Sequence, residues 1–349
     1  MKKILILLII SLIFNIFMSN KNPIVNASGG VCEIVLDQES GRVLHSVNAD
    51  EKRAMASTTK IVTCITVLDN YDINQELEIK KEWTGIEGSS IYLKEGERYT
   101  VEDLLYGLML RSGNDSAVAL ANGLSGSIER FAVLMNKTAI KCGAENSSFV
   151  NPHGLDDDQH YTTAYDLAMI TRYAMHNEKF SKIVSSKKYL CTANGEKKVW
   201  YNKNKMLNDY EFATGVKTGY TKKAGRCLVS SSNKNNFKLI CVVLNCGPMF
   251  ERSSQLLNQS YNSYNRVKIV DKEKSICEVL NSKNKLVPAY LKNDLYYPLT
   301  PNEEKELSFN LKIYPKEKIL PKFGQECGTI EISFKKRLIF EQKIYTILE

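Results

Sequence analysis

The chain has 349 residues, of which 43% are apolar and 25% are charged, with 8 Pro and 19 Gly. This composition excludes a mini-protein, a collagen-like chain and a disordered polyelectrolyte, and it provides for one large domain or two modest ones. Lys and Arg number 47 against 39 acidic residues, giving a net charge of +8 that is spread along the chain. Because no nucleic-acid-reading motif accompanies this charge, we do not expect nucleic-acid binding.

Residues 1–27 have the features of a secretory signal peptide. Lys2 and Lys3 precede an almost unbroken apolar run from Ile4 to Met18, and small residues at 25–27 suit a signal peptidase. The apolar run has 15 residues, fewer than the roughly 20 that span a bilayer, so a permanent anchor is the weaker alternative. We therefore predict export and cleavage after Ala27.

The next 240 or so residues combine strands and helices. Residues 31–37 and 42–47 are β-rich and predict a hairpin, and from residue 57 to 69 the apolar residues recur at helical spacing. A capping box at Thr100 and Asp103 predicts the start of a helix that runs to Leu110, and a second box at Thr163 and Asp166 predicts the start of a helix over 167–175. Two more helices are predicted between them, over 118–124 and 128–142. Apolar β-type runs follow at 226–231 and 237–245, and 250–267 is helix-permissive.

The sequence changes character after residue 268. Short runs of strand spacing occur at 307–313, 328–334 and 337–347, and five of the eight prolines fall here. We expect a separate β-rich domain over 268–349, after a domain over 28–267.

Nine cysteines and four histidines do not indicate a disulfide scaffold or a zinc site. There is no Cys-x-x-Cys pair and no His-Glu-x-x-His spacing, so no metal or other cofactor is expected. Cys64, Cys227 and Cys241 lie in apolar periodic stretches, which predicts buried thiols that pack as small apolar side chains.

Three short motifs carry the chemistry: Ser57-Thr58-Thr59-Lys60, Ser112-Gly113-Asn114 and Lys217-Thr218-Gly219. Each alone is weak, because an isolated Ser57 could be a helix N-cap and the other two could be an ordinary loop and a strand end. Together, in this order, they are specific.

The first motif predicts an activated serine. If Ser57 opens the helix, Lys60 lies one turn on and on the same face, so its amine can approach the Ser57 hydroxyl. A lysine can act as the base if burial or a second cation lowers its pKa, and Lys217 could be that cation. The backbone N–H of Ser57, at a positive helix terminus, could help to hold an oxyanion.

The other two motifs predict substrate contacts. Ser112 would relay a proton to the leaving group and Asn114 would hydrogen-bond a substrate amide. Lys217 and Thr218 offer a charge and a hydroxyl to a carboxylate, and Gly219 would let a substrate backbone lie against the strand edge. These contacts favour an acyl compound that ends in a free carboxylate.

The combined motifs resemble those of the serine-type D-alanyl-D-alanine carboxypeptidases, the low-molecular-mass penicillin-binding proteins; the same motif set also occurs in class A β-lactamases. The resemblance covers nearly all of the mature chain, and its main stretches are 56–63, 112–117, 151–155, 163–168, 215–221 and 224–229. It implies an α/β (α+β) transpeptidase fold, in which helices and a helical subdomain flank an antiparallel sheet, followed by a small β-rich C-terminal domain.

The resemblance also implies an activity and its residues. Ser57 would be the nucleophile, Lys60 the base and Ser112 the proton relay, and the backbone N–H of Tyr220 would be a second oxyanion donor. The substrates would be peptidoglycan muropeptides ending in D-Ala-D-Ala, and β-lactam antibiotics would acylate the same serine. The enzyme would act in the cell wall or at the outer face of the cytoplasmic membrane, and peripheral membrane association is left open.

Several alternatives stay open at this point. A D,D-endopeptidase shares the motifs, whereas a β-lactamase is disfavoured because no Glu-x-x-x-Asn equivalent is apparent between Asn114 and Lys217. A non-catalytic wall-binding or penicillin-sensing module is disfavoured by the intact motifs. Nearby, His153 is interpreted as part of a turn at the rim of the site, Asp166 as a capping acid, and Lys203 as a residue near the substrate carboxylate that stays outside the catalytic set.

Overall fold

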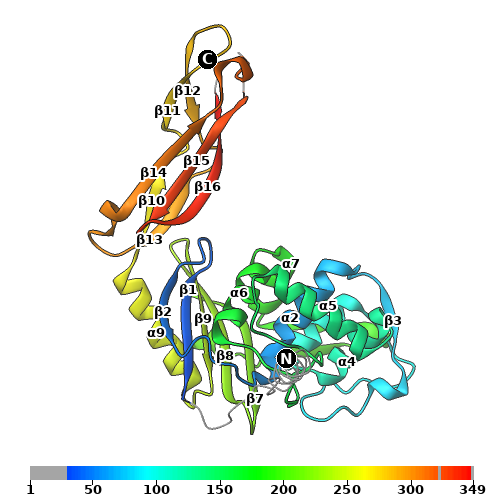
Figure 1. The fold of residues 1–349 in the computed structure, drawn as a ribbon. Helices are drawn as coiled ribbons and strands as arrows, with labels where there is room; N and C mark the ends of the chain where they lie inside the picture. The colour runs from blue at the N-terminus through cyan, green and yellow to red at the C-terminus, as the bar shows by residue number, and fades with distance from the viewer. Residues whose placement is uncertain (1–29, 321–323, 347–349) are drawn as a thin grey trace, which may run out of the picture.

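The structure is a computed structural model, which describes residues 30–320 and 324–346. It has a large unit of helices and strands, from which an elongated all-β unit extends (Figure 1). The predicted signal peptide lies outside the described residues. No helix within the described ranges is long and apolar enough to cross a membrane.

A five-stranded antiparallel sheet forms the centre of the large unit. Its spatial order is β2 (Val43–Val47), β1 (Cys32–Asp37), β9 (Phe237–Leu244), β8 (Gly225–Lys234) and β7 (Ala213–Thr221). The predicted hairpin is β1–β2, and the two predicted apolar runs are β8 and β9, so the sequence located most of this sheet.

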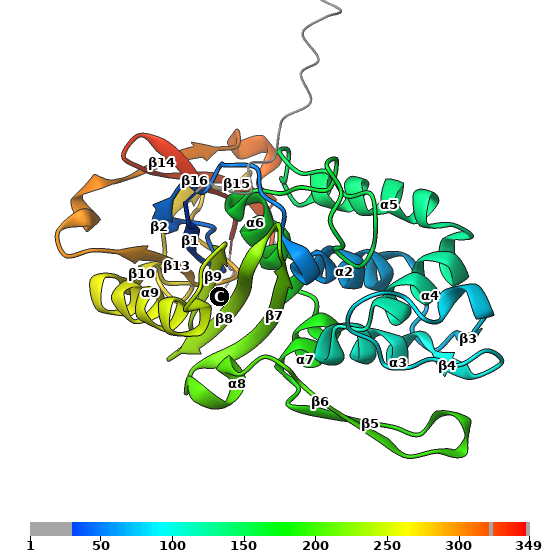
Figure 2. The same ribbon diagram turned by 90° about the horizontal axis from the view of Figure 1, so that it is seen from below.

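Helices cover both faces of the sheet because its strands are apolar on both sides. On β1, Ile34 and Leu36 join the core on one face and Val35 joins the core on the other. The first core includes α2 (Lys60–Asn70) and α6 (Ala164–Met175), and the second includes α9 (Met249–Ser263). Figure 2 shows α9 on one side of the strands and α2 on the other.

The helical subdomain lies beyond α2. Its elements are α3 (Val101–Tyr106), a π-helical turn η3 (Gly107–Arg111), α4 (Asn114–Ser125), α5 (Ile128–Lys141), α7 (Glu178–Ser185), the short 3-10 turn η2 (Lys81–Trp83) and the β3 (Glu76–Glu78) and β4 (Arg98–Thr100) pair. A hairpin of β5 (Lys188–Cys191) and β6 (Lys198–Tyr201), with η4 (Ala193–Gly195) at its turn, leads through α8 (Met206–Asp209) to β7. Within the described residues, α7 and this hairpin were not predicted.

The two predicted capping boxes have different outcomes. Thr100 and Asp103 cap α3 reciprocally, as predicted. Thr163 accepts a hydrogen bond from the backbone N–H of Asp166, but the Asp166 carboxylate accepts from Asn146 N–H and the Ser147 hydroxyl. Only the Thr163 half of the second capping box forms, because the Asp166 carboxylate instead binds the segment before α6.

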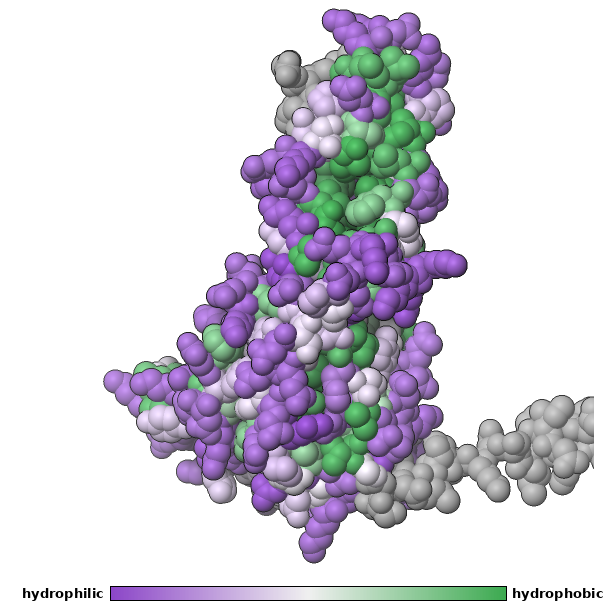
Figure 3. Space-filling model, turned by 90° about the vertical axis from the view of Figure 1, so that its left-hand side faces the viewer, coloured by the Kyte–Doolittle hydropathy of each residue, from purple (hydrophilic) through white to green (hydrophobic). Residues whose placement is uncertain are grey.

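The C-terminal unit is built from β-strands. A sheet has the order β11 (Cys277–Leu280), β12 (Leu286–Tyr290), β16 (Arg337–Thr346), β15 (Glu326–Phe334), β14 (Leu307–Ile313), and β10 (Asn265–Val270) pairs with β13 (Leu295–Leu299). Two short 3-10 turns complete it, η5 (Glu303–Glu306) and η6 (Lys316–Lys318). Apolar side chains gather on one face of this unit (Figure 3). On the edge strand β14, Phe309 is half exposed.

The helix-permissive prediction for 250–267 is wrong at its end. Helix α9 stops at Ser263, and residues 265–267 begin β10. Val267 and Ile269 alternate onto the core of the C-terminal unit, so strand periodicity decides the local structure there.

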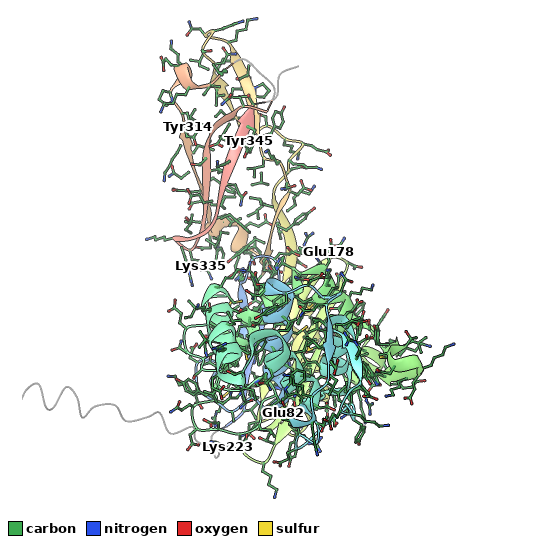
Figure 4. The ribbon with its side chains drawn as sticks, turned by 90° about the vertical axis from the view of Figure 1, so that its right-hand side faces the viewer. Glu82, Glu178, Lys223, Tyr314, Lys335 and Tyr345 are labelled. Carbon is green, nitrogen blue, oxygen red and sulfur yellow. The ribbon has the colours of Figure 1, made fainter. Side chains whose placement is uncertain are left out.

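One arginine joins the two units. Arg42, in the turn between β1 and β2, pairs with the Glu303 carboxylate at 2.9 Å and lies over the Phe334 ring at 4.5 Å. Glu303 also pairs with Lys335 at 3.0 Å, and Figure 4 shows Lys335 at the end of the C-terminal unit that faces the large unit. The junction therefore contains a largely buried ion pair.

All nine cysteines lie in the described ranges and are free thiols. Cys64, Cys227 and Cys241 are fully buried, which confirms the prediction that they pack as small apolar side chains.

Candidate active site

The first motif forms a tight turn followed by a helix. Residues Ala56–Thr59 form a 3-10 turn, η1, and α2 begins at Lys60. Ser57 therefore lies inside this turn rather than at the N-cap of an α-helix. Lys60 nonetheless follows one turn later, and its Nζ lies 3.0 Å from Ser57 Oγ, as the spacing predicted.

The Lys60 amine is fully buried and has three oxygen neighbours. Besides Ser57 Oγ, these are Asn114 Oδ1 at 2.7 Å and the backbone oxygen of His153 at 2.6 Å. Burial, followed by the charge of Lys217, holds the pKa of Lys60 well below its usual range, and Asp115 acts in the opposite direction. The amine is therefore suited to be a neutral base.

The turn at 151–155 supplies the backbone oxygen. Asn151 Oδ1 accepts hydrogen bonds from the N–H groups of His153 and Gly154, at 3.3 and 2.7 Å. The His153 ring accepts from Leu155 N–H, and burial lowers its pKa to about 4, so the ring is neutral. The sequence predicted a turn at the rim, but not that its carbonyl contacts the lysine.

The second motif joins two helices beside Lys60. Ser112 ends η3 with a φ of 63°, and Asn114 begins α4. Asn114 uses Oδ1 for Lys60 and donates from Nδ2 to the backbone oxygen of Glu87. Among the hydrogen bonds of the described residues, none joins the buried Ser112 hydroxyl to Ser57 or Lys60, so its role as a relay stays a prediction.

The third motif lies on β7 and packs against η1. Lys217 is buried, and burial together with the charge of Lys203 lowers its pKa to about 7. A Cβ at Gly219 would lie 3.0 Å from Met55 O and 3.1 Å from Ser57 N. Gly219 therefore lets the strand approach the nucleophile turn of its own chain. That it also lets a substrate backbone lie against the strand edge stays a prediction.

A cavity of about 440 Å³ opens over Ser57 and Asn114, and Lys217 and Thr218 are not among the residues that line it. Its lining is Ser57, Gly88, Ser89, Ser90, Tyr92, Arg111, Asn114, His153, Gly154, Leu155, Lys203, Tyr220 and Thr221. Lys203 donates to Ser89 Oγ and Arg111 to the backbone oxygen of Tyr201, and neither forms an ion pair within the described residues. Two cations without an acidic partner make the cavity suitable for an anionic ligand.

Two buried residues that support the site were not predicted. The His160 Nδ1 accepts from Val150 N–H, so its Nε2–H donates to Thr59 Oγ1, which in turn donates to Ala56 O. Burial lowers the pKa of His160 to about 3, which keeps this ring neutral. The Asp115 carboxylate accepts from the backbone N–H groups of Ile91 and Leu93. No local motif in the sequence marks either role.

No three His, Cys, Asp or Glu side chains meet in the described part of the chain in a way that could hold a metal ion. The chemistry available from the described residues is that of a serine beside a buried amine, facing a cationic cavity.

Two family models match the chain. A family model described as D-alanyl-D-alanine carboxypeptidase matches residues 19–247, and one described as penicillin-binding protein 5, C-terminal domain, matches residues 264–348.

Among curated proteins, the chain is 33% identical over 261 residues to D-alanyl-D-alanine carboxypeptidase DacF of Bacillus subtilis, covering 72% of this chain and 67% of that protein. It is 35% identical to DacC of Escherichia coli, covering 67% of this chain and 62% of that protein. The matched segment thus spans about two thirds of these relatives. The crystal structure of penicillin binding protein 5 from Haemophilus influenzae has a TM-score of 0.73 and 26% identity, covering 91% of this chain and 96% of that one.

Proposed function

This chain belongs to the D-alanyl-D-alanine carboxypeptidase family, and from that premise we propose that it removes the terminal D-Ala from peptidoglycan stem pentapeptides through an acyl-enzyme on Ser57. β-Lactam antibiotics would acylate the same serine, because they present a reactive amide and a carboxylate in the same relative positions as the D-Ala-D-Ala end. The protein is a serine peptidase that needs no oxidant or reductant for this reaction.

The main support is the arrangement of three oxygens around Lys60 Nζ. A neutral amine has two protons and one lone pair. The oxygens of Asn114 and His153, at 2.7 and 2.6 Å, can only accept hydrogen bonds, so the two N–H groups of the amine donate to them. The lone pair is then directed at Ser57 Oγ, 3.0 Å away, which is the only one of the three that can donate.

We propose the following reaction steps for this arrangement. Lys60 takes the Ser57 proton while Oγ attacks the D-Ala-D-Ala carbonyl, and the backbone N–H groups of Ser57 and Tyr220 stabilise the oxyanion. The C–N bond breaks as the proton passes to the leaving amine, with Ser112 as the proposed relay, and D-Ala departs. Water then attacks the ester as it loses a proton to neutral Lys60; the bond between Oγ and the acyl carbon breaks, and Lys60 returns the proton to Ser57 Oγ.

The proposed carboxylate contacts are Lys217 and Thr218 on β7. Lys203 and Arg111 support this assignment, because they leave the cavity with positive charge that no acid in the described residues neutralises. A substrate carboxylate entering the site would raise the pKa of Lys217 from about 7 and so keep its ammonium charged.

We also propose the signal peptide over 1–27, export, and action in the cell wall or at the outer face of the cytoplasmic membrane. The catalytic domain would begin at residue 28, and the pairing of β10 with β13 favours a boundary just before Asn265 rather than at 268.

The test is mass analysis of a pentapeptide muropeptide after incubation with the purified protein. We expect loss of one alanine with the wild type and with Ser46→Ala, a control on the exposed face of β2. Ser57→Ala should abolish both the loss of alanine and labelling by a fluorescent penicillin. Persistence of either would contradict the assignment of Ser57 as the nucleophile. Cleavage of cross-linked dimers without alanine release would favour a D,D-endopeptidase. Turnover of penicillin at several per second would favour a β-lactamase.

A further inference from the structure

Three residues at the active site have a backbone conformation that is uncommon for their residue types. Of the twelve non-glycine residues with positive φ among the described residues, seven are Asn and two are Lys335 and Lys336 in the β15–β16 turn. The remaining three are Ala56, Tyr92 and Ser112. Ala56 precedes the nucleophile and Ser112 opens the second motif, so two of the three belong to the machinery already described.

Tyr92 is the third, and it has no role in any of the motifs. Its φ is 62°, a region that tyrosine rarely adopts and that Gly and Asn adopt readily. The conformation is imposed from both sides: Ile91 and Leu93 are buried, and the N–H groups of both donate to the buried Asp115 carboxylate. Tyr92 N–H itself donates to Ser90 Oγ, which donates to Asp115.

The result is an aromatic ring held outwards at the mouth of the cavity. Tyr92 is 79% exposed and is one of the residues that line the cavity over Ser57. Within the described residues its ring makes no hydrogen bond, aromatic stacking or cation–π contact. The side chain therefore contributes little to folding, although its backbone conformation is unfavourable.

A ring in this position has a clear complement in the substrate. The other side chains that line the cavity are mostly polar or cationic and suit the reacting amide and its carboxylate. The stem peptide continues beyond the D-Ala-D-Ala pair, so its preceding residues must leave the cavity across the rim. Aliphatic carbons that cross an exposed aromatic face are removed from water, which favours binding.

We propose that Tyr92 is a substrate-binding residue whose ring packs against the aliphatic part of the stem-peptide residues that precede D-Ala-D-Ala. This inference rests on the proposed carboxypeptidase function and extends it, because it assigns preference for a long stem over the bare dipeptide end. Asp115 is the positioning residue that holds the loop.

The experiment compares kcat/KM for a stem pentapeptide and for N-acetyl-D-Ala-D-Ala in three variants. For Tyr92→Ala and Tyr92→Asn we expect a decrease of about fivefold to tenfold on the pentapeptide, equivalent to about 1 to 1.4 kcal/mol, mostly as a raised KM. The decrease on the dipeptide should be smaller, so the preference between the substrates falls. Tyr92→Phe should keep that preference within about twofold.

Two further measurements separate binding from structure. Asn suits a positive φ, so Tyr92→Asn should melt at the wild-type temperature or above it, whereas a merely structural role would leave its kcat/KM unchanged. The control Phe309→Ala removes a half-exposed ring from β14 in the other unit and should not alter the substrate preference.

Several results would overturn the proposal. Equal losses on both substrates would mean that the ring does not contact the stem, and a Tyr92→Phe loss as large as that of Tyr92→Ala would assign the contact to the hydroxyl. A loss seen only when the pentapeptide carries its disaccharide would place the ring on the glycan. If the wild type releases D-Ala from neither substrate, the proposed function fails first, which is a distinguishable outcome.

Discussion

Gly154 offers a sharp test of how closely the turn at 151–155 must approach the nucleophile. A Cβ at Gly154 would lie 2.0 Å from Ala56 O, 2.5 Å from Ala56 C and 2.9 Å from Thr59 Oγ1. Contacts of a Cβ essentially never fall below 3.0 Å, so in Gly154→Ala the turn and η1 must separate by about 1 Å. Because His153 O, one residue earlier, contacts Lys60 Nζ, this shift displaces an acceptor from the base.

The expected loss of stability in Gly154→Ala has two parts. Alanine at a φ of 89° costs about 1–2 kcal/mol, and relief of the overlap costs about 1–3 kcal/mol, so we expect about 2–5 kcal/mol of lost stability. Displacing a catalytic contact by about 1 Å can reduce the rate by about 100-fold. We therefore expect acylation by a fluorescent penicillin, measured on the folded fraction, to fall by about that factor.

Gly143→Ala is the matched control. Gly143 has a similar φ of 81°, but its added Cβ would meet only Met169 Cε at 3.9 Å. It should lose about 1–2 kcal/mol of stability and keep the wild-type acylation rate. If the acylation rate of Gly154→Ala is within threefold of that of Gly143→Ala, the close approach of the turn does not affect the base, and the reasoning is refuted.

The remaining predictions concern the base, its neighbouring cation and the junction between the units. Lys60→Ala should slow penicillin acylation by about 10²–10⁴-fold with the fold intact; an unchanged rate would mean another base. The Lys217 ammonium lowers the pKa of Lys60, so Lys217→Gln should raise that pKa and move the acidic limb of the acylation pH profile to higher pH; an unmoved limb would exclude Lys217 as the cause. Arg42→Ala should destabilise the junction by about 1–3 kcal/mol in calorimetry with acylation unchanged, because the largely buried Glu303 carboxylate then has one partner fewer. The Lys335 side chain is largely exposed, so Lys335→Ala should reduce the stability by less than about 1 kcal/mol. Equal losses of stability in the two variants would argue against a special role for Arg42.

Much of the fold could be predicted because local patterns agreed with the tertiary environment. The β1–β2 hairpin, α5, β8 and β9 follow directly from strand and helix periodicity. Periodicity did not predict the helix type at two places, where the backbone departs from a regular α-helix. The end of α3 widens into the π-helical turn η3, and Ser57 lies in a 3-10 turn, both beside the reacting groups.

Tyr92 and His160 could not have been found from the sequence for a related reason. Neither follows a spacing rule, and both depend on partners far along the chain: Asp115 for the loop of Tyr92, and Thr59 for His160. A side chain that acts through a distant partner has no local signature.

The sequence by itself determined which reacting groups the protein has and how two of them meet. Ser57 and Lys60 are three residues apart, and any helical turn brings such a pair together. The folded structure decided what makes Lys60 a base: burial, the charge of Lys217 from β7, and the backbone oxygen of His153. Every residue has a backbone carbonyl, so the sequence cannot mark the one that will accept a hydrogen bond from the amine. The low polarity around the amine likewise exists only once distant segments have closed over it.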